Sequence, residues 1–293
     1  MTGLTFGFSL VPTLDIGAHR ELALAAEDHG LELLGIQDHP YVPAYLDTFV
    51  VAAALLSATE RIHVFPDVAN LPLRPPAMLA KTAAALDIVS GGRFELAVGA
   101  GGYWDAIGRL GVERRSPAEA NAALEEAFAI MRAVWGTGGA IHRHGTHYTV
   151  DGLEPGPVPA HPIELWTGAQ GPKALALTGR IADGWAAPIP SYLPYEKWTP
   201  AHTILDEAAT AAGRRPEDVR RIAQVVGTIT DTLGELQVEH GSAPARGTAE
   251  QWADWLTRLA ESFTSFVFWP EEQSLDQVVR FARDVVPLVR AAV

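Results

Sequence analysis

The sequence contains no cysteine, which excludes disulfides, thiolate nucleophiles and cysteine-ligated zinc. Basic charge is also scarce, because 22 Lys and Arg stand against 35 Asp and Glu, giving a net charge of −13. That balance argues against nucleic acid or an anionic membrane as partner. No run approaches the roughly 20 apolar residues of a membrane span, and the N-terminus lacks a signal peptide's basic region, so we expect a cytoplasmic protein.

Apolar runs rich in strand-forming residues alternate with helical stretches, a pattern typical of parallel βα units. Strands are predicted at residues 5–11, 33–38, 62–68, 93–99, 163–168, 184–189, 222–229 and 264–269. The helices predicted to follow them lie at 18–29, 48–59, 76–89, 117–135, 172–181, 194–212, 248–262 and 274–292. Eight such units favour an α/β fold, a closed (β/α)8 TIM barrel forming one domain over residues 1–293, with an open doubly wound sheet as the alternative.

Two segments interrupt this rhythm. Residues 136–162 are rich in Gly and Pro and hold two short strand-like pieces, so we predict an insertion between units four and five that forms a hairpin. Residues 231–246 are polar and Gly-rich, which predicts a long loop after strand seven. Neither segment suggests a domain boundary.

Active sites of such barrels lie at the C-terminal ends of the strands, and the end of strand two carries Asp38 and His39. A His beside an Asp at this edge can act as a general acid or base, or hold a cofactor ring by hydrogen bonds. The alternative is a loop histidine with no chemical role, closed off by Pro40. We take Asp38 and His39 as candidate catalytic residues.

Strands three and four end in small residues. Ala69 and Asn70 leave strand three and are followed by prolines that form a rigid wall, while strand four ends in "GRFELAVGAGG". This glycine run lacks the third spacing glycine and the following acidic strand of a dinucleotide-binding turn. Gly99, Ala100 and Gly101 therefore favour close approach of a ligand of another kind, with a simple tight turn as the alternative.

Strand five ends at a predicted helix start, where exposed amides favour an anion. The residues are Thr167, Gly168, Ala169, Gln170 and Gly171. Helix N-termini bind phosphate groups, and barrels hold phosphates at such loops. The segment "HRHGTH", with His142, His144 and His147, suggests metal binding less than a solvated hairpin, because no carboxylate cluster accompanies it. We predict no metal site.

The strings "QDHP", "DVANLPLRPPAMLAKTAAALDIVSGGRFELAVGAGG" and "GPKALALTGRIADGW" resemble the bacterial luciferase-like family of flavin- and deazaflavin-dependent oxidoreductases. The resemblance covers most of residues 4–190. It implies a barrel that binds FMN or coenzyme F420 at its mouth, and dimers are common in the family. The chain is accordingly predicted to act on a small-molecule substrate and to form a homodimer.

The resemblance also implies roles for individual residues. Asp38 and His39 would lie near the reactive edge of the ring, with Ala69 and Asn70 behind it through a cis peptide. Gly99, Ala100 and Gly101 would pass close to the ring or its ribityl chain, and residues 167–171 would hold the phosphate. Gly102 stands where some sugar-phosphate oxidising members carry an acid, which disfavours that substrate class.

The sequence thus predicts an oxidoreductase that uses coenzyme F420 or FMN for hydride transfer or monooxygenation. Aromatic residues near the strand ends would line its substrate pocket, namely Tyr41, Tyr103, Trp104, Trp185 and Trp269. Two alternatives remain, a barrel that binds such a ligand without turnover and a metal-dependent hydrolase in which His39, His142 and His144 converge on one ion.

Overall fold

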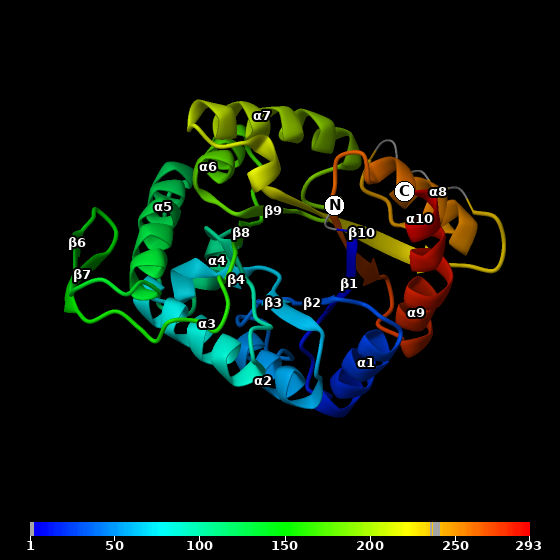
Figure 1. Cartoon of the computed structure of the whole chain (residues 1–293), viewed down its shortest axis with the longest axis horizontal. Helices are drawn as coiled ribbons and strands as arrows, with labels where there is room; N and C mark the ends of the chain where they lie inside the picture. The colour runs from blue at the N-terminus through cyan, green and yellow to red at the C-terminus, as the bar shows by residue number, and fades with distance from the viewer. Residues whose placement is uncertain (1–2, 235, 237–240) are drawn as a thin grey trace.

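Figure 1 shows a ring of strands enclosed by helices in the computed structural model, which describes residues 3–234, 236 and 241–293. Eight strands correspond to the predicted ones: β1 (Thr5–Leu10), β2 (Leu33–Ile36), β3 (His63–Pro66), β5 (Leu96–Gly99), β8 (Leu165–Thr167), β9 (Gly184–Ala187), β10 (Arg220–Ile229) and β12 (Ser265–Pro270). Two shorter strands, β4 (Ala69–Asn70) and β11 (Ala245–Gly247), join the same sheet.

The sheet is parallel throughout and closes on itself. Its strand order is β3–β2–β1–β12–β10–β9–β8–β5–β4, with β11 beside β10. Closure occurs at a single bridge, where Val64 of β3 pairs with Phe94 just before β5. The Val64 amide donates to the Arg93 carbonyl (2.9 Å), and the Glu95 amide donates to the Val64 carbonyl (3.1 Å). This seam consists of one bridge, and β4 extends it by pairing with the end of β5.

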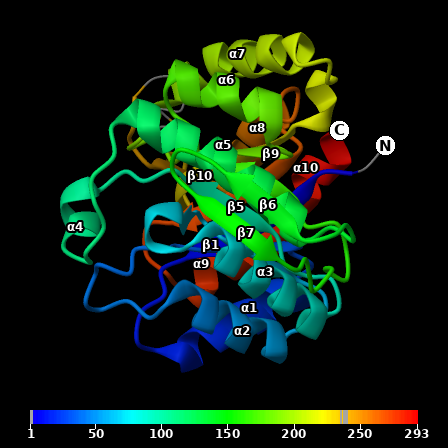
Figure 2. The same cartoon turned by 90° about the vertical axis from the view of Figure 1, so that its left-hand side faces the viewer.

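Helices cover the outside of the ring (Figure 1). They are α1 (Ile16–Asp28), α2 (Thr48–Ala58), α3 (Pro76–Ser90), α5 (Pro117–Val134), α6 (Pro172–Ile181), α7 (Trp198–Ala211), α8 (Ala249–Leu259), α9 (Leu275–Arg280) and α10 (Val286–Ala292), the last two joined by a π turn at 281–285. The short helix α4 (Trp104–Gly108) stands apart from this layer, on the connection between β5 and α5 (Figure 2). Short 3₁₀ turns occupy 71–73, 195–197 and 216–218. Capping boxes start α5 at Ser116 and α8 at Thr248, because each side chain accepts a hydrogen bond from the third helical amide.

The irregular segment 136–162 contains an antiparallel hairpin, β6 (Ile141–His144) and β7 (Thr149–Leu153). The hairpin lies outside the helix ring beside α5 (Figures 1 and 2). Glu126 of α5 holds its turn by accepting hydrogen bonds from three consecutive amides, residues 146–148. Residues 235 and 237–240 of the predicted loop 231–246 lie outside the described residues, while Ala245 and Arg246 belong to β11.

The core has two parts, because strand side chains alternate between the barrel interior and the helices. The inward cluster is Leu33, Phe65, Ala97, Trp166, Ala186, Ile222 and Val267, and Phe65 and Trp166 meet edge to face at 5.1 Å between ring centroids. The outward cluster joins the sheet to the helices. None of the described helices is long and apolar enough to cross a membrane.

Candidate functional site

The side chains that face the barrel interior change from apolar to polar near the C-terminal ends of the strands. Two residues beyond members of the inner cluster, towards the C-terminal ends, stand Asp67, Gln224 and Trp269, and Ser9 stands near the end of β1. The Gln224 amide donates to Asp67 Oδ1 at 2.8 Å. The other carboxyl oxygen lies only 2.9 Å from where a Cβ on Gly35 would stand, so the carboxyl fills space that this glycine leaves.

Four buried polar atoms in this region have no hydrogen-bond partner within the described residues. They are Ser9 Oγ, Asp67 Oδ2, Asn70 Oδ1 and Trp269 Nε1. Each belongs to the last residues of a strand or to the residue just after one. Because buried polar groups in native proteins are nearly always paired with protein, water or ligand, their concentration at one end indicates that a polar partner belongs there.

Asp67 is the most perturbed acid of this layer. Burial raises the pKa of Asp67 to about 7, while the Gln224 amide and the nearby Ser9 hydroxyl, which does not reach hydrogen-bonding geometry, oppose the rise. A carboxyl poised near neutrality can both give and take a proton. The sequence reading missed this residue because it lies inside a predicted strand, 62–68. An acid within an apolar run is the signal that could have revealed it.

Asp38 joins two strand ends. Its carboxylate is 2% exposed and accepts a hydrogen bond from the Asn70 amide at 2.8 Å. Arg74 donates to Asp38 (3.1 Å) and to Asp47 (2.9 Å), the residue that caps α2. Although burial opposes the charge, these two carboxylates raise the pKa of Arg74. The network fixes the turn after β3 against the loop after β2.

His39 lies in an aromatic group on the rim. Its Nδ1 pairs with the Tyr41 hydroxyl at 2.6 Å, and its ring meets Tyr103 edge to face at 5.9 Å between centroids. The hydroxyls of Tyr103 and Tyr192 lie 2.5 Å apart. Burial lowers the pKa of His39, and Asp38 partly offsets this, so the environment favours the neutral ring. Nε2 is then the nitrogen left to face a ligand.

Small residues let three strand ends converge on the turn 67–72. A Cβ on Gly99 would lie 2.9 Å from a Val68 methyl, and one on Gly168 would lie 3.4 Å from the same methyl. Gly101, at φ +108°, leaves room for Pro72 and Trp104, each of which would lie under 3.0 Å from an added Cβ. Residues predicted from strands two to five are therefore neighbours at one edge.

The predicted cis peptide between Ala69 and Asn70 is wrong. Within the described residues, the non-prolyl cis bond joins Asp67 to Val68. Ala69 and Asn70 instead pair in extended register with Val98 and Gly99, as strand β4. The chain turns earlier than the sequence suggested, since β3 ends at Pro66.

The loop 167–171 carries the N-terminus of α6. Gly171 caps this helix with no side-chain hydrogen bond, and Pro172 follows, so its first amides have no side-chain acceptor. The Thr167 hydroxyl, by contrast, pairs with that of Thr178 at 2.7 Å and is 2% exposed. The Ala169 carbonyl accepts from the Trp185 indole. Backbone amides, rather than the threonine, are thus free for an anion.

Trp185 does not line the mouth as predicted. Its ring is fully buried on the outward side, against His202 of α7 and Phe263. The alternation of the strand explains this, because Ala186 is the inward residue of β9. His39 is not grouped with His142 and His144, which pair with Asp151 on the hairpin, so the described residues do not bring together the three histidines of the alternative metal-dependent hydrolase.

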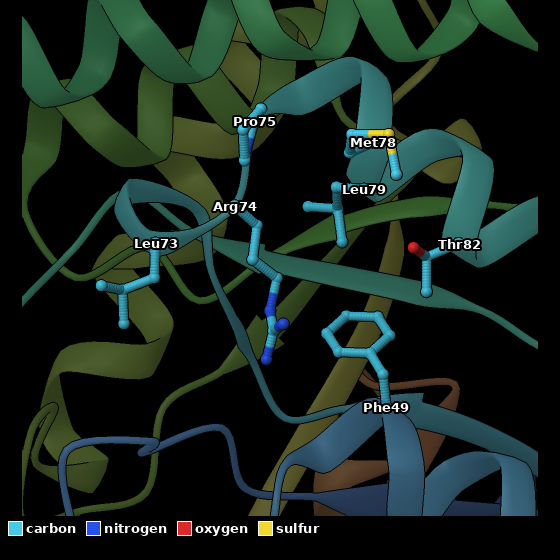
Figure 3. A pocket seen from close by; sticks show the side chains of 7 residues that line it. All are labelled: Phe49, Leu73, Arg74, Pro75, Met78, Leu79 and Thr82. Atoms are coloured by element: carbon cyan, nitrogen blue, oxygen red, sulfur yellow. The ribbon is translucent and has the colours of Figure 1, made fainter. Parts of the chain in front are cut away.

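A hollow of about 190 Å³ lies behind Arg74, between α2 and α3 (Figure 3). Its lining is Phe49, Leu73, Arg74, Pro75, Met78, Leu79 and Thr82. The Arg74 guanidinium stands 4.4 Å from the centre of the Phe49 ring. None of the predicted cofactor residues lines this hollow.

A model of the luciferase-like monooxygenases matches residues 5–278. The chain belongs to this family. It is 30% identical over 249 residues to the F420-dependent glucose-6-phosphate dehydrogenase of Mycolicibacterium gilvum, covering 79% of this chain and 70% of that one. It is 28% identical over 233 residues to pyrimidine monooxygenase RutA of Escherichia coli, covering 75% of this chain but only 59% of RutA.

Solved structures share the family fold. An F420-dependent secondary alcohol dehydrogenase in complex with an F420–acetone adduct superposes with a TM-score of 0.83 at 20% identity, covering 98% of this chain and 99% of that one. Riboflavin lyase RcaE, with modified FMN, gives 0.81 at 17% identity, covering 99% and 92%. The prediction of a (β/α)8 barrel is confirmed.

Proposed function

We propose that this chain is an oxidoreductase that binds coenzyme F420 or FMN at the barrel mouth and uses it for hydride transfer or monooxygenation of a small organic substrate. The observation that carries the proposal is the convergence of the ends of β2, β5 and β8 on the turn 67–72, where Asp38 accepts a hydrogen bond from the Asn70 amide and buried polar atoms stand unpaired. Family membership and the names of relatives support the same cofactors.

The mouth fits a phosphate-bearing cofactor. Both cofactors carry a phosphate, and the start of α6 offers amides with no capping side chain, beside an exposed Lys173. A Cβ on Gly171 would meet nothing within 4 Å, so the approach to these amides is open. We assign the backbone of residues 168–171 to the phosphate. Of the residues 167–171 that the sequence predicted for this role, we leave out Thr167, because its hydroxyl pairs with that of Thr178.

The ring system of the cofactor would lie on the side of the mouth opposite the phosphate. Asn70 Oδ1 is buried and unpaired, and Gly99 and Gly101 leave the wall of the turn smooth. The bound cofactor supplies the redox chemistry, and the protein supplies orientation and exclusion of water. Asp38 holds the Asn70 backbone, and His39 presents a neutral Nε2 towards a ligand. Asp67 lies deeper in the barrel, and burial raises its pKa to about 7, so this carboxyl can hold a proton near neutral pH.

The side chains on the rim limit which substrates fit. Tyr41, Tyr103 and Tyr192 surround His39 with half-exposed rings, which suits a small, partly apolar molecule. Gly102, which is exposed, offers no carboxyl, and we propose that sugar phosphates are not substrates despite the similarity to a glucose-6-phosphate dehydrogenase. A single domain, a homodimer and a cytoplasmic location remain predictions.

Fluorescence titration with F420 and with FMN tests the proposal. We expect saturable one-to-one binding of one cofactor, weakened by His39→Gln and unchanged by His29→Gln, a histidine on the exposed end of α1. Binding followed by no turnover with secondary alcohols, aldehydes or pyrimidines would favour the non-catalytic barrel. Binding of neither cofactor would contradict the proposed function.

A further inference from the structure

The N-terminal face of the barrel carries a compact group of possible metal ligands, far from the mouth. His63 is the first residue of β3, Glu95 directly precedes β5, and His161 lies shortly before β8. One donor atom from each of these residues lies within 4.8 Å of the other two. No other such group of three exists among the described residues. The three are far apart in the sequence, which is why no spacing motif reveals them.

Two of the donor-atom separations lie on either side of the value that one ion requires, and the third is no more than 4.8 Å. His161 Nε2 lies 2.9 Å from Glu95 Oε1, and His63 Nδ1 lies 3.6 Å from the same oxygen. Ligand atoms on a tetrahedral zinc with bonds near 2.0–2.1 Å stand about 3.3 Å apart, between these two values. The two imidazole rings are perpendicular, at 6.0 Å between centroids, so both reach the carboxylate from different sides.

Neighbouring groups orient these ligands in the manner of metal sites. Asp87, fully buried at the end of α3, pairs with His161 Nδ1 at 2.6 Å and accepts the His161 backbone amide at 3.0 Å. A carboxylate on the far nitrogen fixes the ring so that Nε2 faces the ion, as in carboxylate–histidine–zinc arrangements. The Glu164 amide holds Glu95 Oε2, leaving Oε1 for the two histidines.

We propose that His63, Glu95 and His161 bind a zinc-class divalent cation on the N-terminal face. Two imidazoles and one carboxylate suit Zn²⁺, with water completing the coordination. Binding replaces the proton that His161 Nε2 shares with Glu95 and releases it to solvent. The side chains of His63 and His161 are 36% and 25% exposed, so an ion has an entry path.

The site lies across the seam at which β3 closes the barrel against β5. His63 and Glu95 flank Val64 and Phe94, the single bridge that closes the ring. An ion held by both strands, and by the segment leading into β8, would fasten this seam. The cation is therefore structural, since the cofactor residues all lie at the opposite end of the strands.

Isothermal calorimetry with Zn²⁺ on chelator-treated full-length protein tests the proposal. We expect one ion per chain and a higher melting temperature with Zn²⁺ than with chelator. His63→Gln should weaken binding at least about tenfold and abolish the thermal shift. His142→Gln, which removes a histidine from the exposed cluster with Asp151, should change neither. In chelator, His63→Gln should melt within a few degrees of the wild type, which separates lost ligation from lost folding.

Substitution of Co²⁺ gives a second readout that needs no variant. A tetrahedral visible spectrum with nitrogen ligation supports the site. An octahedral, hexa-aquo-like spectrum overturns it, as does the absence of Zn²⁺ binding by the wild type. Binding that survives His63→Gln and disappears in His142→Gln would assign the ion to the hairpin and also overturn the proposal.

Discussion

The two ends of the barrel differ in whether the oxygens of their buried polar side chains are hydrogen-bonded. At the N-terminal end, Asp87 and Glu95 have each carboxyl oxygen engaged, and hydrogen bonding to Glu95 raises the pKa of His161 to about 9. At the C-terminal end, Asp67 and Asn70 each leave an oxygen unpaired. Satisfied networks stabilise a fold, whereas unpaired buried groups cost free energy unless a ligand meets them. The difference separates the end whose networks hold the barrel together from the end at which we propose that the cofactor binds.

The largest expected effect is on stability, at the N-terminal end. Asp87→Ala removes the acceptor of two His161 hydrogen bonds and leaves the imidazolium with one carboxylate. We expect the free energy of unfolding to fall by about 3 kcal/mol. Urea denaturation measures this, and cofactor affinity of the folded fraction should stay within twofold. A parallel loss of affinity would break the separation between the two ends.

At the mouth, Asp38→Asn should lower cofactor affinity rather than stability. The amide can still accept the Asn70 hydrogen bond but no longer pairs with the charge of Arg74. Loss of a charge-assisted contact is worth about 1.5 kcal/mol or more, so the cofactor dissociation constant should rise about tenfold. Asp105→Asn is the matched control, because Asp105 pairs with Arg114 on the exposed surface nearby. Equal effects of the two variants would contradict the assignment of Asp38.

Asp67 provides a pH test. Its folded pKa near 7 exceeds the ordinary value of 3.8, so the folded state keeps the proton longer than the unfolded state. Stability should therefore decline as pH rises from about 4 to 7, by about 2 kcal/mol between pH 5 and 7.5. Asp67→Asn should remove this part of the slope in denaturation curves at the two pH values. An unchanged slope would show that the carboxyl ionises normally.

The smallest effect is expected at neighbouring glycines. Gly101→Ala places a Cβ at φ +108° against Pro72 and Trp104, which should cost about 1 kcal/mol and weaken cofactor binding a fewfold. Gly102→Ala meets nothing within 4 Å and should change little. Thermal melts and cofactor titrations of the two variants measure stability and affinity, and they compare Gly101, in the wall of the mouth, with the exposed Gly102 beside it. Identical behaviour would mean that the shape of the turn does not matter.

The alternation of apolar, strand-forming runs with helical stretches predicted the fold well, and some helix starts carry their own caps, as at Ser116 and Thr248. The strand-end rule also placed Asp38, Asn70 and Gly168 in one region. Predicting side-chain direction was harder. Trp185 was assigned to the wrong side of β9, and Asp67 was missed. Whether a strand side chain points into the barrel or towards the helices depends on the register and closure of the sheet.

The group His63, Glu95 and His161 lay beyond sequence reasoning for a different reason. These residues begin separate strands, and only the closure of β3 against β5 brings them together. No local spacing encodes such a contact, whereas the hairpin histidines 142, 144 and 147 drew attention by being adjacent. The sequence predicted a solvated hairpin for those histidines, and it offered no signal for a group that only folding assembles.

Hydrogen–deuterium exchange with and without cofactor most directly tests the division between the two ends. Bound F420 or FMN should slow exchange in peptides covering 67–72, 99–102 and 168–174, and leave 87–95 and 161–165 unchanged. Protection confined to the N-terminal segments, or absent from all three mouth segments at saturating cofactor, would contradict the placement of the site.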